Sequence, residues 1–275
     1  MNDEIIKKIH DVNYKVLRAF DEICKANEIP YFLDSGTLLG AVRHHDFIPW
    51  DDDLDVAVFA SDFPRLKAVL QEQLPPEYEY VEYTSYNGYF RNFINRVIVK
   101  GSQIRKMQPN EPYSKHATLG IDIFVMESAP ENAFLRFVKI TARRLTFAFA
   151  LGHYWGLDYR NRPLFRKIVL YILASIGRLI PLKWLFRFHE FLVNYEPINE
   201  KELLLGINRT FPFLTCIFRK EWFSQSCNVQ IRDLTLPAPI GYDSILKAFY
   251  GDYMQLPPEE ERKPRCTLDE VTIPE

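Results

Sequence analysis

Hydrophobic spacing divides the first half of the chain into short helices and strands. Apolar residues recur at helical spacing over residues 3–28 and 61–73, with charged residues between them, which predicts two amphipathic helices. A shorter helix is predicted over 38–43. Apolar or alternating runs predict strands at 31–33, 53–59, 78–83, 90–99 and 119–125. This order of elements predicts an α+β fold built on a small sheet.

Residues beyond 130 show a different pattern, with few strand signals. The stretches 131–155 and 164–196 are long, apolar and basic, and both are typical of helices. One more helix is predicted over 241–250, among proline-rich spacers and a polar tail. The pattern therefore predicts a mixed-sheet core with an added helical region.

Composition narrows the class of protein. The chain has 275 residues, of which 47% are hydrophobic and 25% charged, so a sizeable core can form. The formal net charge of −2 argues against general binding to nucleic acid. The four cysteines are scattered without a CxxC pair, and the opening segment is charged and amphipathic rather than a signal peptide. Both features favour a reducing cytoplasm.

Aspartates gather at the start of one predicted strand. Asp53 and Asp55 are two residues apart, so both carboxylates point to the same side of a strand. Asp122 is a single acid inside the apolar strand predicted over 119–125. If the two strands are neighbours, three carboxylates converge, and such a cluster repels itself unless a cation is bound. Mg²⁺ is the expected cation because it prefers oxygen ligands and is shared with substrate phosphates, and Mn²⁺ is the alternative.

Other interpretations of these acids are open at this point. An isolated Asp-x-Asp is often a solvated run of charge at a strand edge, and Asp122 alone suits a cap or a core ion pair. The alternation from Asp53 into an apolar strand, directly after Ile48-Pro49-Trp50, argues against a mere surface run. A calcium-binding loop is excluded because its sixth position, which should be glycine, is Val56.

A glycine and a threonine precede the acidic strand. Gly36 and Thr37 lie between the first strand and the helix predicted over 38–43. At a helix N-terminus such residues can present N–H and O–H groups to a phosphate, although a plain cap is the more common role. Their position shortly before an Asp-x-Asp strand favours the phosphate role.

Two motifs resemble those of a known family. The signature of the LicD family is matched closely by LDSGTLLGAVRH at 33–44 and FIPWDDDLDV at 47–56. Its closing motif is similar to YDSIL at 242–246, YGDYM at 250–254 and the proline pair at 257–258. LicD proteins are phosphocholine transferases of bacterial surface glycans, distantly related to the fukutin-type ribitol-phosphate transferases. The resemblance implies a nucleotidyltransferase fold.

The resemblance also implies partners and site residues. It implies a donor such as CDP-choline, a divalent metal, and a sugar hydroxyl of a glycan or glycolipid, such as lipopolysaccharide or teichoic acid, as acceptor. By position, Asp53, Asp55 and Asp122 match the family's metal-binding and catalytic acids. One departure is His45-Asp46, where the family commonly has a Lys-Gly pair. The substrate-binding positions fall on Gly36, Thr37, Arg43, Arg96, Tyr250 and Asp252.

The resemblance suggests a reaction scheme. The acids hold the metal, while Thr37, Arg43 and the Gly36 backbone orient the donor phosphate. Asp122 shares the metal or acts as general base. An acceptor hydroxyl then attacks in line and the nucleotide leaves. Which phosphorus is attacked, which alcohol is transferred and which glycan accepts it stay open.

This interpretation divides the chain into three expected parts. Residues 1–128 form the catalytic core, 129–197 a helical region that faces a membrane or the acceptor, and 198–275 a segment that closes over the core. Two rivals are a glycosyltransferase, which can also hold a metal and a nucleotide-sugar with Asp-x-Asp, and a non-catalytic nucleotide-binding protein. The early position of the Asp-x-Asp disfavours the first rival, and the presence of all three acids disfavours the second.

The stretch 164–188 is strongly apolar. Basic residues flank a nearly continuous apolar run at 168–177, which is shorter than the ~20 residues needed to span a bilayer. A core helix is the favoured interpretation. The alternative is a helix in the membrane interface, which would suit a lipid-linked acceptor and would place the protein peripherally on the inner leaflet.

Overall fold

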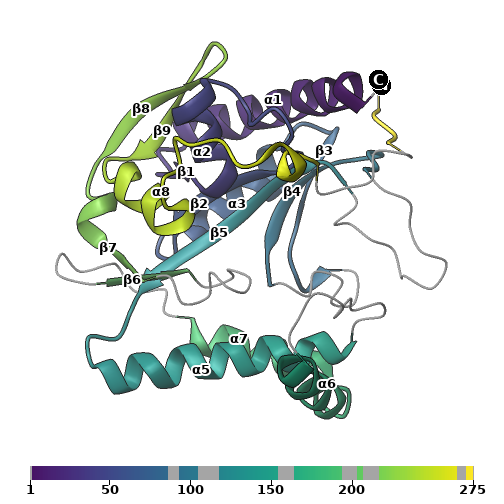
Figure 1. Cartoon of the computed structure of the whole chain (residues 1–275), viewed down its shortest axis with the longest axis vertical. Coiled ribbons are helices and arrows are strands. Elements are labelled where there is room, and N and C mark those ends of the chain that lie inside the picture. Colours follow the sequence, from purple (N-terminus) through teal and green to yellow (C-terminus); the bar gives the residue numbers. More distant parts are fainter. Residues whose placement is uncertain are drawn as a thin grey trace.

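A mixed sheet forms the centre of the molecule (Figure 1). The computed structural model describes residues 2–85, 93–104, 118–153, 164–193, 203–206, 217–264 and 271–274. The strands of the sheet are β1 (Phe32–Leu33), β2 (Leu54–Phe59), β3 (Tyr78–Val81), β4 (Asn95–Val99), β5 (Gly120–Ser128), β6 (Leu203–Gly206) and β7 (Ile217–Arg219). Their order is β1-β2-β5-β4-β3, and β6 and β7 extend the sheet from β5. β2 runs parallel to β5, and every other pair is antiparallel, so the predicted α+β class with a mixed sheet is confirmed.

Two amphipathic helices cover the core as their spacing predicted. They are α1 (Asn2–Ala26) and α3 (Phe63–Gln73). The apolar stripe of α1, including Leu17 and Phe20, is fully buried in the same cluster as the strand residues. Figure 1 shows α1 crossing one end of the molecule, above the sheet. The two helices close the core on that side.

The short helix α2 (Ser35–His44) begins three residues earlier than the sequence predicted. Asp34 occupies its N-cap position, and Ser35 has a positive φ of 47°. Gly36 and Thr37 therefore lie inside the first turn of α2 rather than before it. Both are buried, because α2 packs against β2.

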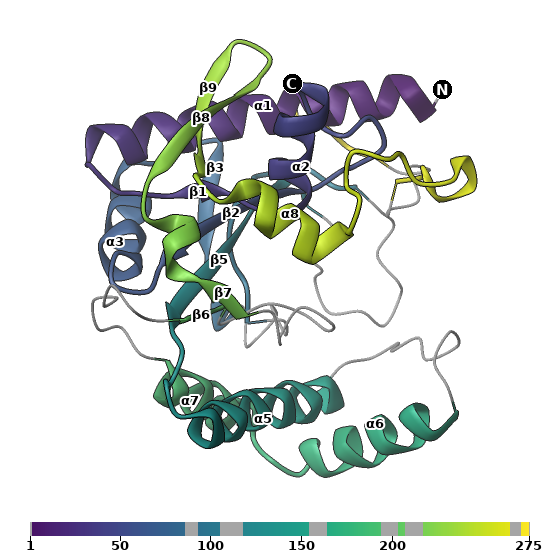
Figure 2. The same cartoon turned by 60° about the vertical axis from the view of Figure 1, so that its left-hand side comes forward.

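A layer of three helices lies at the opposite end of the molecule from α1 (Figures 1 and 2). It consists of α5 (Ala133–Ala150), α6 (Leu164–Gly177) and α7 (Leu182–Leu192), with a 3-10 turn (Leu151–His153) after α5. The helical stretch predicted over 164–196 thus forms two helices within its described residues, 164–193. The chain bends by 107° between α6 and α7, where Pro181 cannot continue a helix.

The core-helix interpretation of 164–188 is wrong for α6. Only Ala174 and Gly177 of its 14 residues are buried. On α7, by contrast, Leu185, Phe186 and His189 are buried against the sheet. The apolar pattern of α6 thus describes an exposed surface.

The second half of the chain contains strands that the pattern did not predict. A separate hairpin joins β8 (Ser226–Ile231) to β9 (Leu234–Pro239). Its two-residue turn is Arg232-Asp233, with Arg232 at a positive φ, and so lacks the usual glycine or asparagine signal. The predicted helix at 241–250 is confirmed as α8 (Tyr242–Tyr250). Two further 3-10 turns span Lys220–Phe223 and Glu259–Glu261.

Candidate active site

Three neighbouring strands bring two aspartates and one arginine together in a row. Asp55 on β2 pairs in register with Asp122 on β5, and Asp122 pairs in register with Arg96 on β4. Residues opposite each other on paired strands share one face of the sheet. The Arg96 guanidinium donates to Asp122 Oδ1, and the two side chains form a largely buried ion pair. The predicted adjacency of the two aspartate strands is confirmed, and Asp122 takes part in the core ion pair that the sequence left open.

The loop before β2 adds further acids. Asp51, Asp52 and Asp53 place carboxylate oxygens within 4.8 Å of one another. Burial raises the pKa of Asp55, and the nearby charges of Asp53, Asp122, Asp34 and Asp51 raise it further. Four carboxylates therefore act on the buried Asp55, which makes a bound cation electrostatically favourable there.

Helix α1 fixes the backbone of this acidic loop. The His10 Nε2–H group donates to the carbonyl oxygen of Asp51 at 2.8 Å, and the Asn13 amide donates to that of Asp52 at 3.3 Å. Burial lowers the pKa of His10, so its ring is neutral at neutral pH. Sequence reasoning missed both residues. Their only signal was that they are polar residues on the buried side of an amphipathic helix.

Helix α2 positions its first turn against the acids. Thr37 Oγ1 accepts a hydrogen bond from the Asp55 N–H at 2.8 Å, and the Asp34 N–H donates to the Asp55 carbonyl at 3.0 Å. A Cβ atom on Gly36 would lie 2.5 Å from Asp51 Oδ2, so only glycine leaves room for that carboxylate. Thr37 therefore holds β2 in place, and Gly36 admits an acid.

A cavity of about 590 Å³ opens beside the acidic loop. It is bounded by α2, by the loop before β2, by the end of α8 and by residues 252–263. Asp51 belongs both to the cavity wall and to the acidic cluster, and Gly36 lies beside it in the wall. Four of the six predicted substrate-binding residues line it: Gly36, Arg43, Tyr250 and Asp252.

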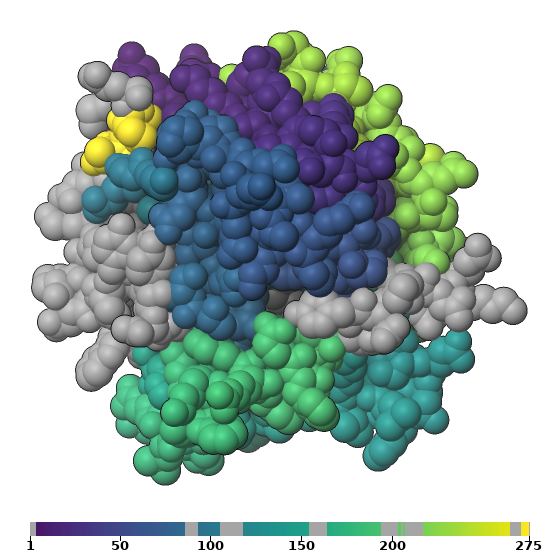
Figure 3. Space-filling view, turned by 180° about the vertical axis from the view of Figure 1, so that it is seen from behind, coloured from purple at the N-terminus to yellow at the C-terminus, as the bar shows by residue number. Residues whose placement is uncertain are grey.

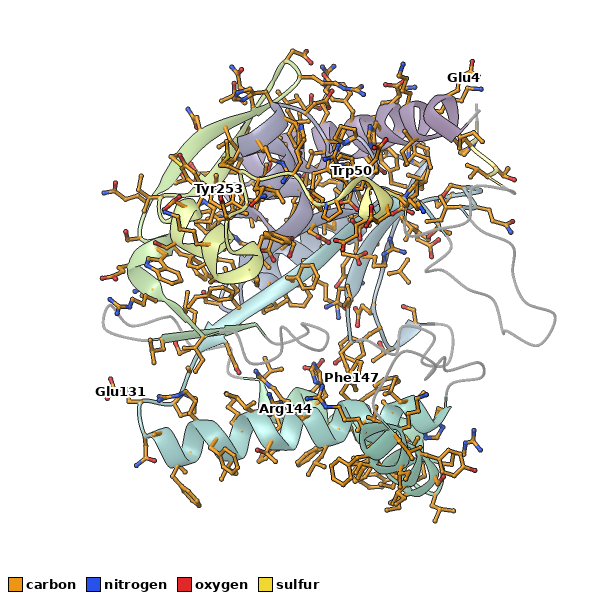
Figure 4. All side chains as sticks on the ribbon, viewed as in Figure 1. Glu4, Trp50, Glu131, Arg144, Phe147 and Tyr253 are labelled. Carbon is orange, nitrogen blue, oxygen red and sulfur yellow. The ribbon has the colours of Figure 1, made fainter. Side chains whose placement is uncertain are left out.

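The closing segment, defined here as residues 251–264, forms one wall of this cavity. Arg43 Nη1 donates to the Tyr253 carbonyl at 2.8 Å and so ties the segment to α2. Lys263 supplies a second cation to the wall. Trp50 also lines the cavity, with the Arg262 guanidinium 5.9 Å from its ring centre. Figure 4 shows Trp50 and Tyr253 in the upper part of the molecule, far from α5.

The predicted site residues have different surroundings. Asp53, Asp55 and Asp122 gather as expected, with Asp51 and Asp34 added to them. Thr37 and Arg96 lie inside the core rather than on the cavity wall. The roles of all these residues toward a substrate stay predictions. Lys263 and Trp50 were missed as wall residues because they reach the cavity only through tertiary folding.

The donor set suits a hard divalent cation. Asp51, Asp53 and Asp55 offer only oxygen ligands, which Mg²⁺ and Mn²⁺ prefer. A cation would also relieve the repulsion that raises the pKa of Asp55. The residues present therefore fit the metal that the resemblance implies.

Comparison with known proteins agrees with this geometry. Residues 28–150 match the family of LicD/FKTN/FKRP nucleotidyltransferase domains. The lipopolysaccharide cholinephosphotransferase LicD of Haemophilus influenzae is 24% identical over 90% of this chain and 91% of its own length. The human ribitol 5-phosphate transferase FKRP is 45% identical over 40 residues, which are 14% of this chain and 8% of that protein.

A third relative matches a segment shorter than that of LicD and longer than that of FKRP. An uncharacterised protein of Rickettsia prowazekii is 38% identical over 90 residues, which are 30% of this chain and 32% of that protein. The matched domain at 28–150 carries the acidic loop and the row of paired side chains on β2, β5 and β4. Through residues 28–150, the chain is therefore similar to the LicD/FKTN/FKRP family of nucleotidyltransferase domains.

Proposed function

We propose that this protein transfers a phospho-alcohol group, phosphocholine in the first instance, from a CDP-linked donor to a sugar hydroxyl of a cell-surface glycan or its lipid-linked precursor. The observation that carries the proposal is the acidic cluster of Asp51, Asp53, Asp55 and Asp122 beside a cavity lined by basic and aromatic side chains. Such a site can hold a diphosphate and a metal together. The relatives, a lipopolysaccharide cholinephosphotransferase and a ribitol 5-phosphate transferase, supply the class of transferred group, and the first supplies the class of acceptor.

The residues of the site suggest their roles. Asp51, Asp53 and Asp55 would hold Mg²⁺, which when bound neutralises charge on the transferring phosphoryl group. Arg43 and Lys263 attract the donor diphosphate from the cavity wall. Positioning and electrostatics then supply most of the rate.

Asp122 acts as the general base, and Arg96 sets its orientation. The acceptor hydroxyl oxygen bonds to the phosphorus that carries the alcohol, and its proton passes to Asp122. The bond from that phosphorus to the nucleotide oxygen breaks, and cytidine monophosphate leaves. Thr37 and the Asp34 backbone keep β2 fixed during this step.

Product analysis tests the proposal. The protein is incubated with Mg²⁺, a glycan acceptor pool and either CDP-choline, CDP-ribitol or a panel of nucleotide-sugars, and products are identified by mass spectrometry. We expect a phospho-alcohol on the acceptor and cytidine monophosphate as by-product, with activity lost on adding EDTA and restored by Mg²⁺ or Mn²⁺. Transfer of a sugar from a nucleotide-sugar, or nucleotide binding without any product, would overturn the proposal.

A matched pair of variants connects the activity to the cluster. Asp53→Asn should lower the transfer rate at least about 100-fold, since it removes a carboxylate that would hold the metal, whose charge stabilises the transferring phosphoryl group. Asp62→Asn, at the N-cap of α3 and outside the cluster, should keep the wild-type rate. Full activity in a folded Asp53→Asn variant would contradict the assigned role.

A further inference from the structure

Exposed apolar side chains are concentrated on the helical layer. Of the 21 large hydrophobic residues that the described part of the chain exposes, 16 lie between Phe134 and Phe191. Phe165 is 76% exposed and Phe191 is 81% exposed. Scattered single apolar residues are normal on a protein surface, but a contiguous patch marks a site of interaction. The layer therefore has a face that is suited to a partner.

The exposed residues of α7 follow one side of the helix. On α7, Trp184, Phe188 and Phe191 recur at helical spacing, while Leu185 and His189 are buried on the other side. Figure 4 shows Arg144 and Phe147 of α5 pointing toward the sheet, and Phe147 packs against the buried cluster there. α5 and α7 thus have an inner side that packs on the core, α6 packs on α5 and the turn after it, and all three helices have an outer side that is apolar.

The layer is fixed firmly to the rest of the protein. Gly152 and Gly177 let α5 and α6 touch, because a Cβ atom on either would lie 2.0 Å from a backbone oxygen of the other segment. The buried Glu127 at the end of β5 pairs with Lys139 and Arg143 of α5. Arg143 also donates to the Leu192 carbonyl of α7 at 3.2 Å. These contacts hold the outer face in one orientation.

The charge of the layer is strongly basic. The described residues 133–153 and 164–193 contain nine Lys or Arg residues and one acid, Glu190. Glu190 is exposed, and its carboxylate accepts a hydrogen bond from the Tyr83 hydroxyl. Arg166, Lys183 and Arg187 are exposed beside the apolar side chains. Two copies of such a face would repel each other, whereas anionic lipid headgroups would attract it.

The helices are arranged to lie along a surface. Within the described residues, no single helix has both the length and the apolar composition for a membrane crossing, and the α6–α7 pair that has both together is bent by 107°. Figures 1 and 2 show α5, α6 and α7 as one layer at an end of the molecule. Seen from behind in Figure 3, the green and teal surfaces of this layer form the lower edge of the protein.

We propose that the outer face of α5, α6 and α7 binds an anionic lipid bilayer, with its aromatic and aliphatic side chains in the interface and its basic side chains at the headgroups. Asp122 precedes Ser128, the last residue of β5, by six positions, and α5 follows that strand. At the rise of an extended strand, the acidic cluster then lies roughly 20 Å from the start of the layer, measured along β5. A membrane-bound acceptor would therefore be modified at a sugar held away from the lipid.

Vesicle flotation tests this proposal without requiring catalysis, so its failure and failure of the proposed function are distinguishable. The full chain is mixed with phosphatidylcholine vesicles that contain or lack phosphatidylglycerol, at low and high salt. We expect flotation with the anionic vesicles at low salt and weaker flotation at high salt. Phe165→Ser combined with Phe191→Ser should lower the bound fraction by about tenfold or more.

Two further variants make the result specific. Arg166→Gln combined with Lys183→Gln should lower binding to anionic vesicles by about fivefold per charge, and is informative even if the serine variant folds poorly. Ile240→Ser removes an exposed apolar residue outside the layer and should bind as wild type does. Absence of flotation at low salt, or wild-type binding by both the serine and glutamine variants, would overturn the proposal. So would a dimer that the serine variant dissociates in a chain that does not bind vesicles.

Discussion

At the residue scale, Gly36 and Gly40 are one helical turn apart on α2, but a side chain at the two positions would meet different kinds of atoms. It would meet a movable side chain at Gly36 and fixed backbone at Gly40. A Cβ atom on Gly36 would meet only the movable end of the Asp51 side chain, 2.5 Å away. Gly36→Ala should therefore keep the free energy of unfolding within about 1 kcal/mol, because alanine also favours the helix. It should still lower the transfer rate at least about tenfold, since Asp51 is displaced from the metal site. Urea denaturation and initial rates measure the two effects separately.

Gly40→Ala is the control for this prediction. Its Cβ atom would lie 2.7 Å from the Asp46 carbonyl oxygen and 3.0 Å from the Ile48 nitrogen, and these backbone atoms cannot move aside. We expect a loss of about 1–3 kcal/mol in the free energy of unfolding, with a smaller effect on the rate of the folded fraction. A Gly36→Ala protein with the full rate would show that Asp51 plays no part in the reaction.

His10 offers a second test at this scale, because it touches the acidic loop only through a backbone carbonyl. His10→Phe keeps a ring beside Phe47, whose centre is 5.0 Å away, but removes the hydrogen bond to Asp51. Losing one such bond costs about 1 kcal/mol. The Mg²⁺ concentration for half-maximal activity should therefore rise about fivefold, with little change in maximal rate. An unchanged metal requirement would mean that α1 does not position the loop.

At the element scale, α7 carries a titratable group into the core. His189 stacks on Phe93 at 4.2 Å, and burial, with a smaller effect from the Arg143 charge, lowers its pKa to about 3. Between pH 6.5 and 3 the unfolded chain binds a proton that the folded chain does not, so stability falls as the pH falls through this window. Lowering the pH from 7.5 to 5.5 should therefore reduce the free energy of unfolding by about 1.4 kcal/mol through this residue.

A variant isolates this effect from other titrating groups. His189→Phe cannot titrate and should lose about 1.4 kcal/mol less stability than wild type over the same pH interval. Urea denaturation at the two pH values measures the difference. Equal losses in both proteins would mean that His189 can bind a proton within the folded core.

The link between β5, α5 and α7 depends on the buried Glu127. Arg143→Met should lower the free energy of unfolding by about 3–5 kcal/mol, because it removes a cation that pairs with the buried Glu127 carboxylate. Combining it with Glu127→Gln should restore much of that loss, since no buried carboxylate then needs compensation. A double-mutant cycle measures the coupling. Additive losses in the cycle would show that the pair does not hold the helical layer.

The local hydrophobic pattern predicted helices and strands better than it predicted which of them pair or pack together. The periodicities of α1, α3 and β2 are strong and gave helices and a strand near their observed bounds. The hairpin of β8 and β9 was missed because Arg232-Asp233 is not a typical turn pair and because prolines occur at Pro237 and Pro239. The exposure of α6 could not be predicted either, since a buried helix and an exposed apolar helix can have the same sequence pattern.

At the scale of the whole molecule, the site combines nearby and distant segments. The shared side of Asp53 and Asp55 and the adjacency of Asp122 followed from strand geometry. The contacts of His10 with Asp51 and of Arg43 with Tyr253 join residues 41 and 210 positions apart, and no local signal predicts such contacts. The pairing of Asp122 with Arg96 likewise depends on β4 lying beside β5.

The closing segment gives the last prediction, because it forms a cavity wall while contributing little to the core. Most of residues 254–264 are exposed, and Tyr253 is the buried residue before them. Ending the chain after Tyr253 should therefore leave the Mg²⁺ requirement intact, and its stability should be close to that of a chain ended after Pro264, because both lack the bridge between Gln103 and Thr272. It should raise the KM for the CDP-linked donor about tenfold or more, since Lys263 and the proline wall are lost. Ending the chain after Pro264 keeps that wall and should keep the wild-type KM. If both truncations give the same KM, the donor does not bind in the cavity between α2 and the closing segment, and its diphosphate must reach the acids from another side.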